Sequence, residues 1–152
     1  MWRCICSSAT PVIRPRHVVR SEASRSAILY IEGDPTQVRL VQLMFEERPT
    51  LQLLTATDGR AGVALARERR PDLILLDLHL RDMAAEDVLH AIRAEPALAQ
   101  TAVIVFTDER YSRLPQRLRV AGAQAYLMKP VNLQEFFDVV DAHLRAHPPP
   151  AS

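Results

Sequence analysis

Five short apolar runs, separated by stretches with helical periodicity, constrain the fold of this chain more than any other feature. Each run has the length of a strand, and most are apolar throughout, which is typical of strands covered on both faces. The runs are AILYI (27–31), LQLLTA (51–56), LILL (73–76), AVIVF (102–106) and AYLM (125–128). Their strict alternation with helical segments predicts βαβ units with right-handed crossovers, and therefore an α/β fold with a parallel sheet between helices.

The segments between the runs place apolar residues on one face of a helix. The last segment is the clearest, because its apolar residues follow the spacing i, i+3, i+4, i+7 and i+11. These residues are Leu133, Phe136, Phe137, Val140 and Leu144. Gly122 stands where a helix C-terminus needs it, and the prolines after His147 end the last helix. The pattern predicts one domain over residues 27–147 and a tail over 148–152.

Charge is unevenly distributed along the chain. Residues 1–26 contain five arginines and one glutamate, whereas the remainder has 14 basic and 17 acidic residues. We expect residues 1–26 to be a disordered basic extension, although a transit peptide or a start codon placed too early would give the same composition. The mildly acidic remainder gives no electrostatic reason to expect nucleic acid binding, and no apolar stretch is long enough to span a membrane. Cys4 and Cys6 are expected to be free thiols in a reducing cytoplasm.

Polar side chains follow the predicted strands where each strand ends. Ligands of parallel α/β folds bind beyond the carboxyl ends of the strands, so these residues are candidates for a site. The polar residues are Glu32, Asp34, Asp77, Thr107, Asp108 and Lys129, and Gly33 and Pro130 lie among them. The two acids that flank Gly33 suggest a cation site, and the glycine indicates either a tight turn or the loss of a third acid.

Four segments carry a resemblance to a known family. They are ILYIEGDP (28–35), ATDGRAGVALARERRPDLILLDLHLRDM (56–83), VIVFTDE (103–109) and AGAQAYLMKP (121–130). In order and spacing they resemble the receiver domain of two-component response regulators, from residue 27 to about residue 147. The resemblance implies a flavodoxin-like, doubly wound five-stranded sheet of order 2-1-3-4-5 with five helices. It also implies a signalling module rather than an enzyme.

The resemblance assigns a role to each of several strand-end residues. The family's phosphoacceptor matches Asp77, which would receive a phosphoryl group from a histidine kinase or phosphotransfer protein in a phosphorelay. Lys129, aimed by a cis peptide bond to Pro130, would pair with the phosphoryl oxygens. Thr107 would donate its hydroxyl to the phosphoryl group. Tyr126 would then swing inward, unless it only packs on a helix.

The resemblance also implies a Mg²⁺ site with one ligand missing. Cations are needed because a carboxylate does not approach a phosphoryl group unless its charge is screened. The family's two consecutive acids align with Glu32, which acts mainly through a water, and with Gly33. Asp77 and the backbone carbonyl of His79 complete the set. Asp34 is interpreted as a helix cap before Pro35 or, alternatively, as a replacement ligand. Because the acid at position 33 is missing, we expect weak Mg²⁺ binding.

Two further departures from the family pattern concern loops. The segment LRDMAAED lacks the usual proline near Arg81 and the usual Asp-Gly pair near Ala84, so the loop after Asp77 is expected to differ in shape. Pro115 falls inside the usual fourth helix. If Ser112 caps this helix, Pro115 lies in its first turn and the helix starts late and is short.

The sequence leaves the output open. The few residues after His147 hold no output domain, so signalling is expected through a downstream partner or self-association across the fourth helix, fifth strand and fifth helix. A fragment of a hybrid kinase is an alternative. Four arginines surround the fourth helix, either as a solvated basic face or as a docking face for an acidic partner or second copy: Arg110, Arg113, Arg117 and Arg119.

The same fold is compatible with other functions, namely those of a degenerate receiver, a cobalamin-binding protein and an FMN-binding protein. A degenerate receiver would fold without being phosphorylated and act as a protein-binding module, and Gly33 is the best argument for it. The Asp-x-His of DLHLRD suggests cobalamin, but the glycine expected at Asp82 is missing. An FMN site is disfavoured because EGDP is acidic and repels phosphate.

Overall fold

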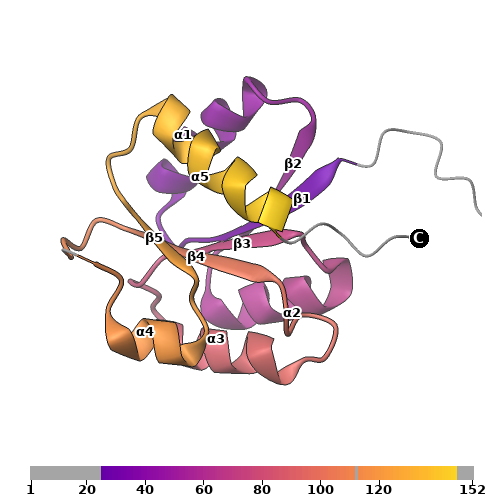
Figure 1. Ribbon diagram of the computed structural model, residues 1–152, viewed down its shortest axis with the longest axis vertical. Coiled ribbons are helices and arrows are strands. Elements are labelled where there is room, and N and C mark those ends of the chain that lie inside the picture. Colours follow the sequence, from indigo (N-terminus) through magenta and orange to yellow (C-terminus); the bar gives the residue numbers. More distant parts are fainter. Residues whose placement is uncertain (1–24, 112, 147–152) are drawn as a thin grey trace, which may run out of the picture.

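The computed structural model describes residues 25–111 and 113–146, and within them five strands alternate with five helices. The elements are β1 (Ser26–Ile31), α1 (Pro35–Glu46), β2 (Leu51–Ala56), α2 (Gly59–Arg69), β3 (Leu73–Leu76), α3 (Ala85–Ala94), β4 (Ala102–Thr107), α4 (Gln116–Ala121), β5 (Ala125–Met128) and α5 (Leu133–Ala146). All strand pairs are parallel, in the order β2-β1-β3-β4-β5 (Figure 1), which confirms the predicted fold. The expected disordered extension and the tail over 148–152 fall almost wholly outside the described residues.

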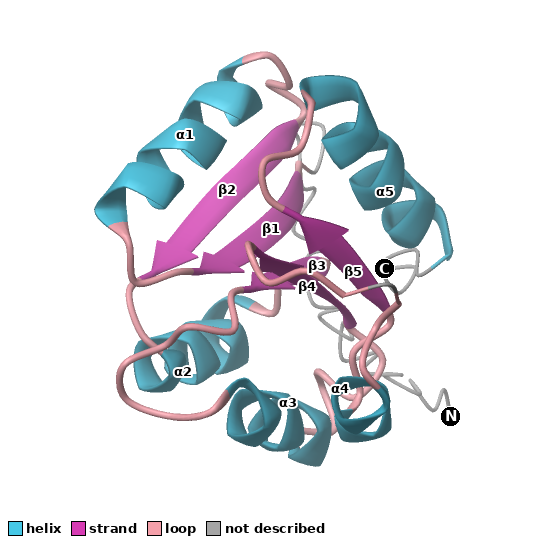
Figure 2. Cartoon of the chain, turned by 90° about the vertical axis from the view of Figure 1, so that its left-hand side faces the viewer, coloured by secondary structure: helices cyan, strands magenta, loops and turns pink. Residues whose placement is uncertain are grey.

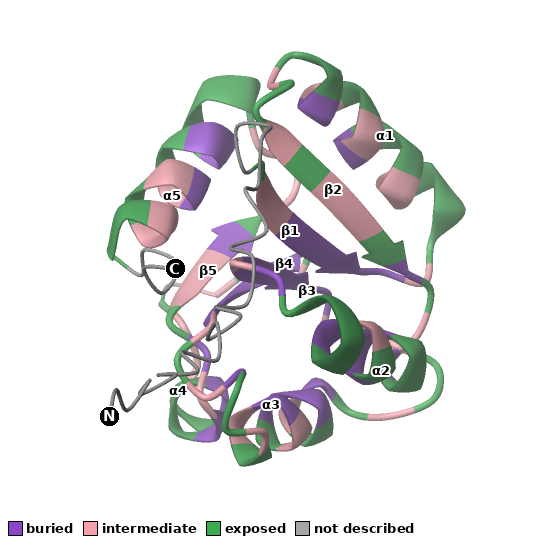
Figure 3. Ribbon diagram, turned by 90° about the vertical axis from the view of Figure 1, so that its right-hand side faces the viewer, coloured by how far each residue is buried: buried purple, intermediate pink, exposed green. Residues whose placement is uncertain are grey.

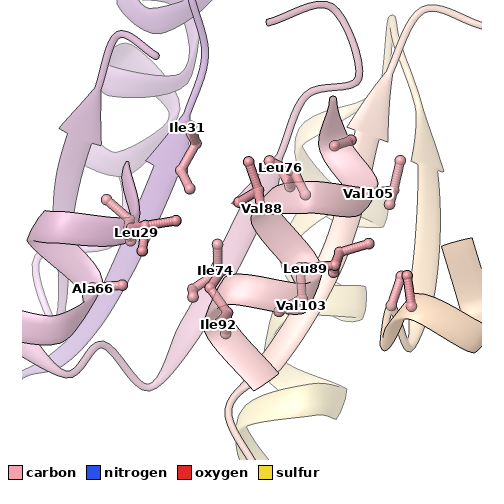
Figure 4. Packing of buried hydrophobic residues seen from close by; sticks show 14 of the residues in the cluster. Leu29, Ile31, Ala66, Ile74, Leu76, Val88, Leu89, Ile92, Val103 and Val105 are labelled. Atoms are coloured by element: carbon pink, nitrogen blue, oxygen red, sulfur yellow. The ribbon is translucent and has the colours of Figure 1, made fainter. Parts of the chain in front are cut away.

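The sheet lies between two layers of helices. Helices α1 and α5 cover one face and α2, α3 and α4 cover the other (Figure 2). The inner strands are buried while the helices present exposed outer faces (Figure 3), as expected for strands covered on both sides. On the α3 face, Val88, Leu89 and Ile92 pack towards the sheet in a fully buried cluster (Figure 4). None of the described helices is long and apolar enough to cross a membrane.

An aromatic cluster fills the opposite face, beneath α1 and α5. Tyr30 of β1 lies 5.9 Å from Phe106 of β4, and Phe106 lies 5.5 Å from Phe136 of α5, measured between ring centroids. Phe45 of α1 completes the cluster at 6.0 Å from Phe136. Since aromatic rings bury large areas, these contacts fix β1 and β4 relative to the two helices.

The helix ends follow local capping rules. The Asp34 side chain accepts a hydrogen bond from Thr36 N at 2.8 Å, and Pro35 is the first residue of α1. Gly122 ends α4 with φ of 118°. Helix α4 is short, as expected, but it begins after Pro115 rather than around it, because ψ of Pro115 is 139°, which is not helical. Ser112, the expected cap, lies outside the described residues.

The loop between β3 and α3 is tied to α2. Asp82 accepts hydrogen bonds from Gly59 N at 2.8 Å and Arg60 N at 2.9 Å, and these bonds lower the pKa of the Asp82 carboxyl. A Cβ atom on Gly59 would come within 2.4 Å of Met83, so only glycine allows this approach. The unusual sequence of this loop is thus accommodated by an anchor at a helix N-terminus, where anions are favoured.

Arg93 of α3 contacts two further parts of the chain. Its Nη1 donates to the carbonyls of Leu98, Ala99 and Thr101 at 2.7–3.2 Å, in the connection to β4. Its Nη2 donates to Gly122 O, at the end of α4, at 2.7 Å. One half-buried guanidinium therefore binds four backbone carbonyls that lie outside the helices and strands.

Candidate functional site

The register of the parallel strands brings the strand ends together. Asp77 N donates to Ile31 O at 3.0 Å, so Glu32 and Asp77 follow β1 and β3 side by side. Lys129 N donates to Thr107 O at 2.8 Å at the ends of β5 and β4. A cleft of about 740 Å³ opens at this edge. Its lining includes Glu32, Gly33, Asp34, Leu40, Met44, Asp77, His79, Arg81, Asp108, Lys129 and Pro130.

Lys129 lies between the two carboxylates. Its Nζ is 2.5 Å from Glu32 Oε2 and 3.1 Å from Asp77 Oδ1. The side chains are 10% exposed for Lys129 and 4% for each acid, so the three charges are almost fully removed from water. Buried charges persist only when paired, and this pairing leaves the group with one net negative charge. The Lys129–Pro130 peptide bond is cis, and Phe106 lies 5.1 Å beneath the ammonium.

The remaining carboxylate oxygens are held by other donors of the chain. Asp34 N donates to Glu32 Oε1 at 2.9 Å, and His79 N donates to Asp77 Oδ2 at 2.7 Å. Tyr30 donates its hydroxyl to Glu32 Oε2 at 2.9 Å. Within the described chain, no buried side-chain oxygen or nitrogen lacks a hydrogen-bond partner. Both carboxylates are therefore fixed in orientation.

Tyr30 was not recognised as a site residue from the sequence, where it reads as part of an apolar run. Its position two residues before Glu32 was the available signal, because side chains at i and i+2 of a strand lie on one face. Its ring is completely buried. Burial raises the pKa of the Tyr30 hydroxyl, and the charge of Glu32 raises it further.

Gly33 has no conformational need to be glycine. Its φ is outside the left-handed region, and a Cβ atom would meet only Thr57 O, at 3.3 Å. A side chain therefore fits after a small adjustment, which favours the interpretation of Gly33 as a lost acid over that of a tight turn. Asp34, the alternative ligand, uses one oxygen to cap α1 and lines the cleft.

The oxygen donors of Glu32 and Asp77 can be judged against the ligands that Mg²⁺ prefers. Over the described residues, no three His, Cys, Asp or Glu side chains gather as a metal-binding group. Glu32 and Asp77 nevertheless place two carboxylates next to each other at the floor of the cleft, and Mg²⁺ accepts one or two carboxylates completed by waters. The two carboxylates therefore fit a Mg²⁺ ion whose coordination is completed by waters.

Thr107 and Tyr126 both contact the residue that follows Asp108. Thr107 is fully buried, and its Oγ1 accepts a hydrogen bond from Glu109 N at 3.3 Å. Tyr126 donates its hydroxyl to Glu109 O at 2.6 Å and accepts from Tyr111 N at 3.2 Å. Thr107 and Tyr126 are thus connected through the backbone of Glu109.

The mouth of the cleft carries a mixture of charges. The His79 ring nitrogen Nε2 lies 3.3 Å from Asp108 and 3.4 Å from Glu109, all at partly or largely exposed positions. Arg81 also lines the cleft. The backbone N–H of His79 reaches Asp77 while its ring reaches the β4–α4 loop, so His79 links the two loops that border the cleft.

The predicted basic face around α4 is partly neutralised. Arg117 forms an ion pair with Glu86 of α3 and also contacts the Tyr111 hydroxyl. Arg119 donates to Leu114 O at 3.5 Å but stays exposed, as do Arg110 and Arg113. Because Glu86 pairs with Arg117, three arginines of the basic face, Arg110, Arg113 and Arg119, have no acidic partner among the described residues.

The chain is similar to known proteins in both sequence and fold. A family model described as "Response regulator receiver domain" matches residues 28–141. The chain is 32% identical over 120 residues to the "Probable transcriptional regulatory protein TcrX" of Mycobacterium tuberculosis, covering 76% of this chain and 48% of that protein. It therefore spans about half the length of this relative.

Two further similarities extend over nearly the whole of the matched protein. "Polar-differentiation response regulator DivK" of Brucella anthropi is 25% identical over 118 residues, covering 78% of this chain and 95% of DivK. The receiver domain of the sensor histidine kinase PA1611 of Pseudomonas aeruginosa PAO1, solved with a magnesium ion in its active site cleft, has a TM-score of 0.72 and 22% identity. This likeness covers 79% of this chain and 98% of that domain and concerns the fold.

Proposed function

Because this chain belongs to the response regulator receiver family, we propose that it acts as a single-domain response regulator that accepts a phosphoryl group on Asp77. The phosphodonor would be a histidine kinase or a phosphotransfer protein, in the cytoplasm. As a receiver, the chain is a signalling module rather than an enzyme. DivK, of which the chain covers 95%, supports the single-domain form.

The observation that carries this proposal is the position of the Lys129 ammonium. It lies within hydrogen-bond distance of the Asp77 carboxylate, at the floor of an open cleft. In the transfer, an Asp77 oxygen forms a bond to phosphorus while the bond from phosphorus to the donor nitrogen or oxygen breaks. Lys129 would compensate the charge that this adds, because a fixed cation in a site shielded from water stabilises a phosphoryl group strongly.

Mg²⁺ would be held by Asp77, by the backbone carbonyl of His79 and, through a water, by Glu32, with Asp34 as a possible further ligand. The bound ion would screen the negative charges of the acceptor and the phosphoryl group. The magnesium ion in the PA1611 receiver supports this assignment. The missing acid at Gly33 makes us expect binding that is weaker than with two direct carboxylate ligands.

After phosphorylation, Thr107 would bind the phosphoryl oxygens and Tyr126 would move inward. The proposed output surface consists of α4, β5 and α5, where Val120, Met128 and Leu133 are exposed. A downstream protein or a second copy would bind there, with Arg110 and Arg113 facing acidic residues. Changing both arginines to Glu should weaken this association in a salt-dependent way, whereas Arg69→Glu on α2 should not.

Mass spectrometry of the intact protein tests the acceptor assignment. With acetyl phosphate and Mg²⁺, the wild type should gain one phosphoryl group and Asp77→Asn should gain none. Asp138→Asn, the same change at an exposed position on α5, should be labelled like the wild type. Equal labelling of Asp77→Asn would refute the assignment.

A degenerate receiver is the second candidate function. Two observations favour it: Gly33 removes an acidic ligand, and each carboxylate oxygen of Glu32 and Asp77 already accepts a hydrogen bond from the chain. A folded wild type that remains unlabelled at every Mg²⁺ concentration would favour this function, in which the chain binds its partner constitutively.

A further inference from the structure

Glu32 Oε2 accepts two hydrogen bonds from side chains of the site. One comes from the Tyr30 hydroxyl, buried in the aromatic cluster, and the other from the Lys129 ammonium. Lys129 is also 5.8 Å from the centre of the Tyr30 ring. Glu32 Oε2 is therefore bound by a neutral donor, the hydroxyl of the fully buried Tyr30, and by a cation, the Lys129 ammonium. The ammonium also binds Asp77.

The hydrogen bond from the Tyr30 hydroxyl affects how strongly Glu32 attracts the Lys129 ammonium. A hydrogen bond to a carboxylate offsets part of its negative charge, and the effect is large where water is excluded. Without the Tyr30 hydroxyl, Glu32 Oε2 would keep Lys129 as its one remaining donor. The ammonium would then be drawn towards Glu32 and away from Asp77, where it is needed when a phosphoryl group arrives.

We propose that Tyr30 is a positioning residue of the acceptor site, and that its hydroxyl sets how Lys129 is shared between Glu32 and Asp77. This inference rests on the proposed function, in which Asp77 is the acceptor. Tyr30 acts through Glu32 and does not touch the phosphoryl group. Its hydroxyl keeps Lys129 available to Asp77 by weakening the competing attraction of Glu32.

Tyr30→Phe tests the proposal because it keeps the ring in the core and removes only the hydroxyl. The Asp77 ¹³Cγ resonance should shift in this variant, although Tyr30 makes no hydrogen bond to Asp77. Phosphoryl uptake from acetyl phosphate at saturating Mg²⁺ should slow by about fivefold. This is the effect expected when the charge-assisted hydrogen bond between Lys129 and Asp77 is weakened but not lost. Tyr111→Phe removes a hydroxyl that serves Glu109 instead and should not shift the Asp77 resonance.

A second pair of variants separates positioning from packing. In a Glu32→Gln background the charge that competes for Lys129 is absent, so adding Tyr30→Phe should change neither the Asp77 resonance nor the uptake rate. Equal effects in both backgrounds would show a packing defect and overturn the proposal. An unshifted Asp77 resonance in Tyr30→Phe would overturn it as well. A shifted resonance in a chain whose wild type takes up no phosphoryl group would support the Tyr30 inference and refute the proposed function.

Discussion

Tyr126 donates a 2.6 Å hydrogen bond to the backbone carbonyl of Glu109, which joins the middle of β5 to the loop that follows β4. The same hydroxyl accepts a hydrogen bond from Tyr111 N. Any inward movement of Tyr126 must break both bonds. In the described conformation, the Tyr126 side chain therefore holds the β4–α4 loop. An inward movement of Tyr126 would release this loop.

Removing the Tyr126 hydroxyl should loosen this loop. In Tyr126→Phe the Tyr111 amide loses its acceptor, and we expect it to exchange with solvent deuterium about fivefold faster, the value of a hydrogen bond near 1 kcal/mol. Tyr111→Phe leaves this backbone bond intact and serves as the control. Unchanged exchange of the Tyr111 amide in Tyr126→Phe would show that the loop does not depend on the hydroxyl.

Restoring an acid at position 33 should strengthen Mg²⁺ binding. Because the backbone of Gly33 is not left-handed and its surroundings admit a Cβ, Gly33→Asp should fold normally. We expect about tenfold tighter Mg²⁺ binding, about 1.4 kcal/mol, from one added carboxylate near the ion. NMR shifts during a Mg²⁺ titration measure this.

A folded Gly33→Asp that binds Mg²⁺ no better than the wild type would argue against a lost ligand. Asp34 would then be the better candidate, and Asp34→Ala should abolish the binding that the wild type shows. Since Asp34 also caps α1, this variant needs a check of stability, with an expected loss of about 1 kcal/mol.

Replacing Arg93 should destabilise the fold. Arg93→Met keeps most of the aliphatic stem but removes the hydrogen bonds that Arg93 donates to four backbone carbonyls. Hydrogen bonds that involve a charged group contribute about 1.5–3 kcal/mol, so we expect a loss of about 2 kcal/mol in the free energy of unfolding by urea. Arg39→Met, at an exposed position of α1, is the control and should change this free energy by less than about 0.5 kcal/mol. Similar values for the two variants would contradict the role given to Arg93.

The buried Tyr30 hydroxyl should make the fold sensitive to alkaline pH. Its pKa is raised in the folded state, whereas in the unfolded chain it is about 10. Below pH 10 both states keep the proton, but above it only the unfolded chain releases it. Stability should therefore fall as pH rises above 10, by about 1.4 kcal/mol per pH unit from this group. Urea unfolding of Tyr30→Phe should show a slope smaller by this amount, and an unchanged slope would exclude the contribution.

The parts of the structure that could be predicted from the sequence are those governed by short-range patterns. Buried strands such as LILL (73–76) are recognisable without knowledge of their neighbours, and Asp34 with Pro35 marks a helix start within two residues. Because parallel strands end at one edge, the fold class placed Glu32, Asp77 and Lys129 at that edge, and the strand order implied by the resemblance made Glu32 and Asp77 neighbours.

The contacts that could not be predicted join residues far apart in the sequence. Asp82 binds the N-terminus of α2, 22–23 residues earlier, and Arg93 reaches Gly122, 29 residues later. The sequence places Arg117 in a basic face, but its ion pair with Glu86, 31 residues earlier, depends on how α3 packs against α4. Charge counting along the sequence does not reveal such neutralisation.

The Arg93 contacts also bear on where this chain tolerates new sequence. The connection between α3 and β4 is a surface segment of the kind in which inserted tags or circular permutation are usually accepted. Three of its carbonyls bind one guanidinium that also binds Gly122 O at the end of α4, so lengthening this connection would disturb the contact between α3 and the end of α4. A fluorescent or affinity label is therefore better joined at the chain ends, beyond β1 or α5, than at this loop.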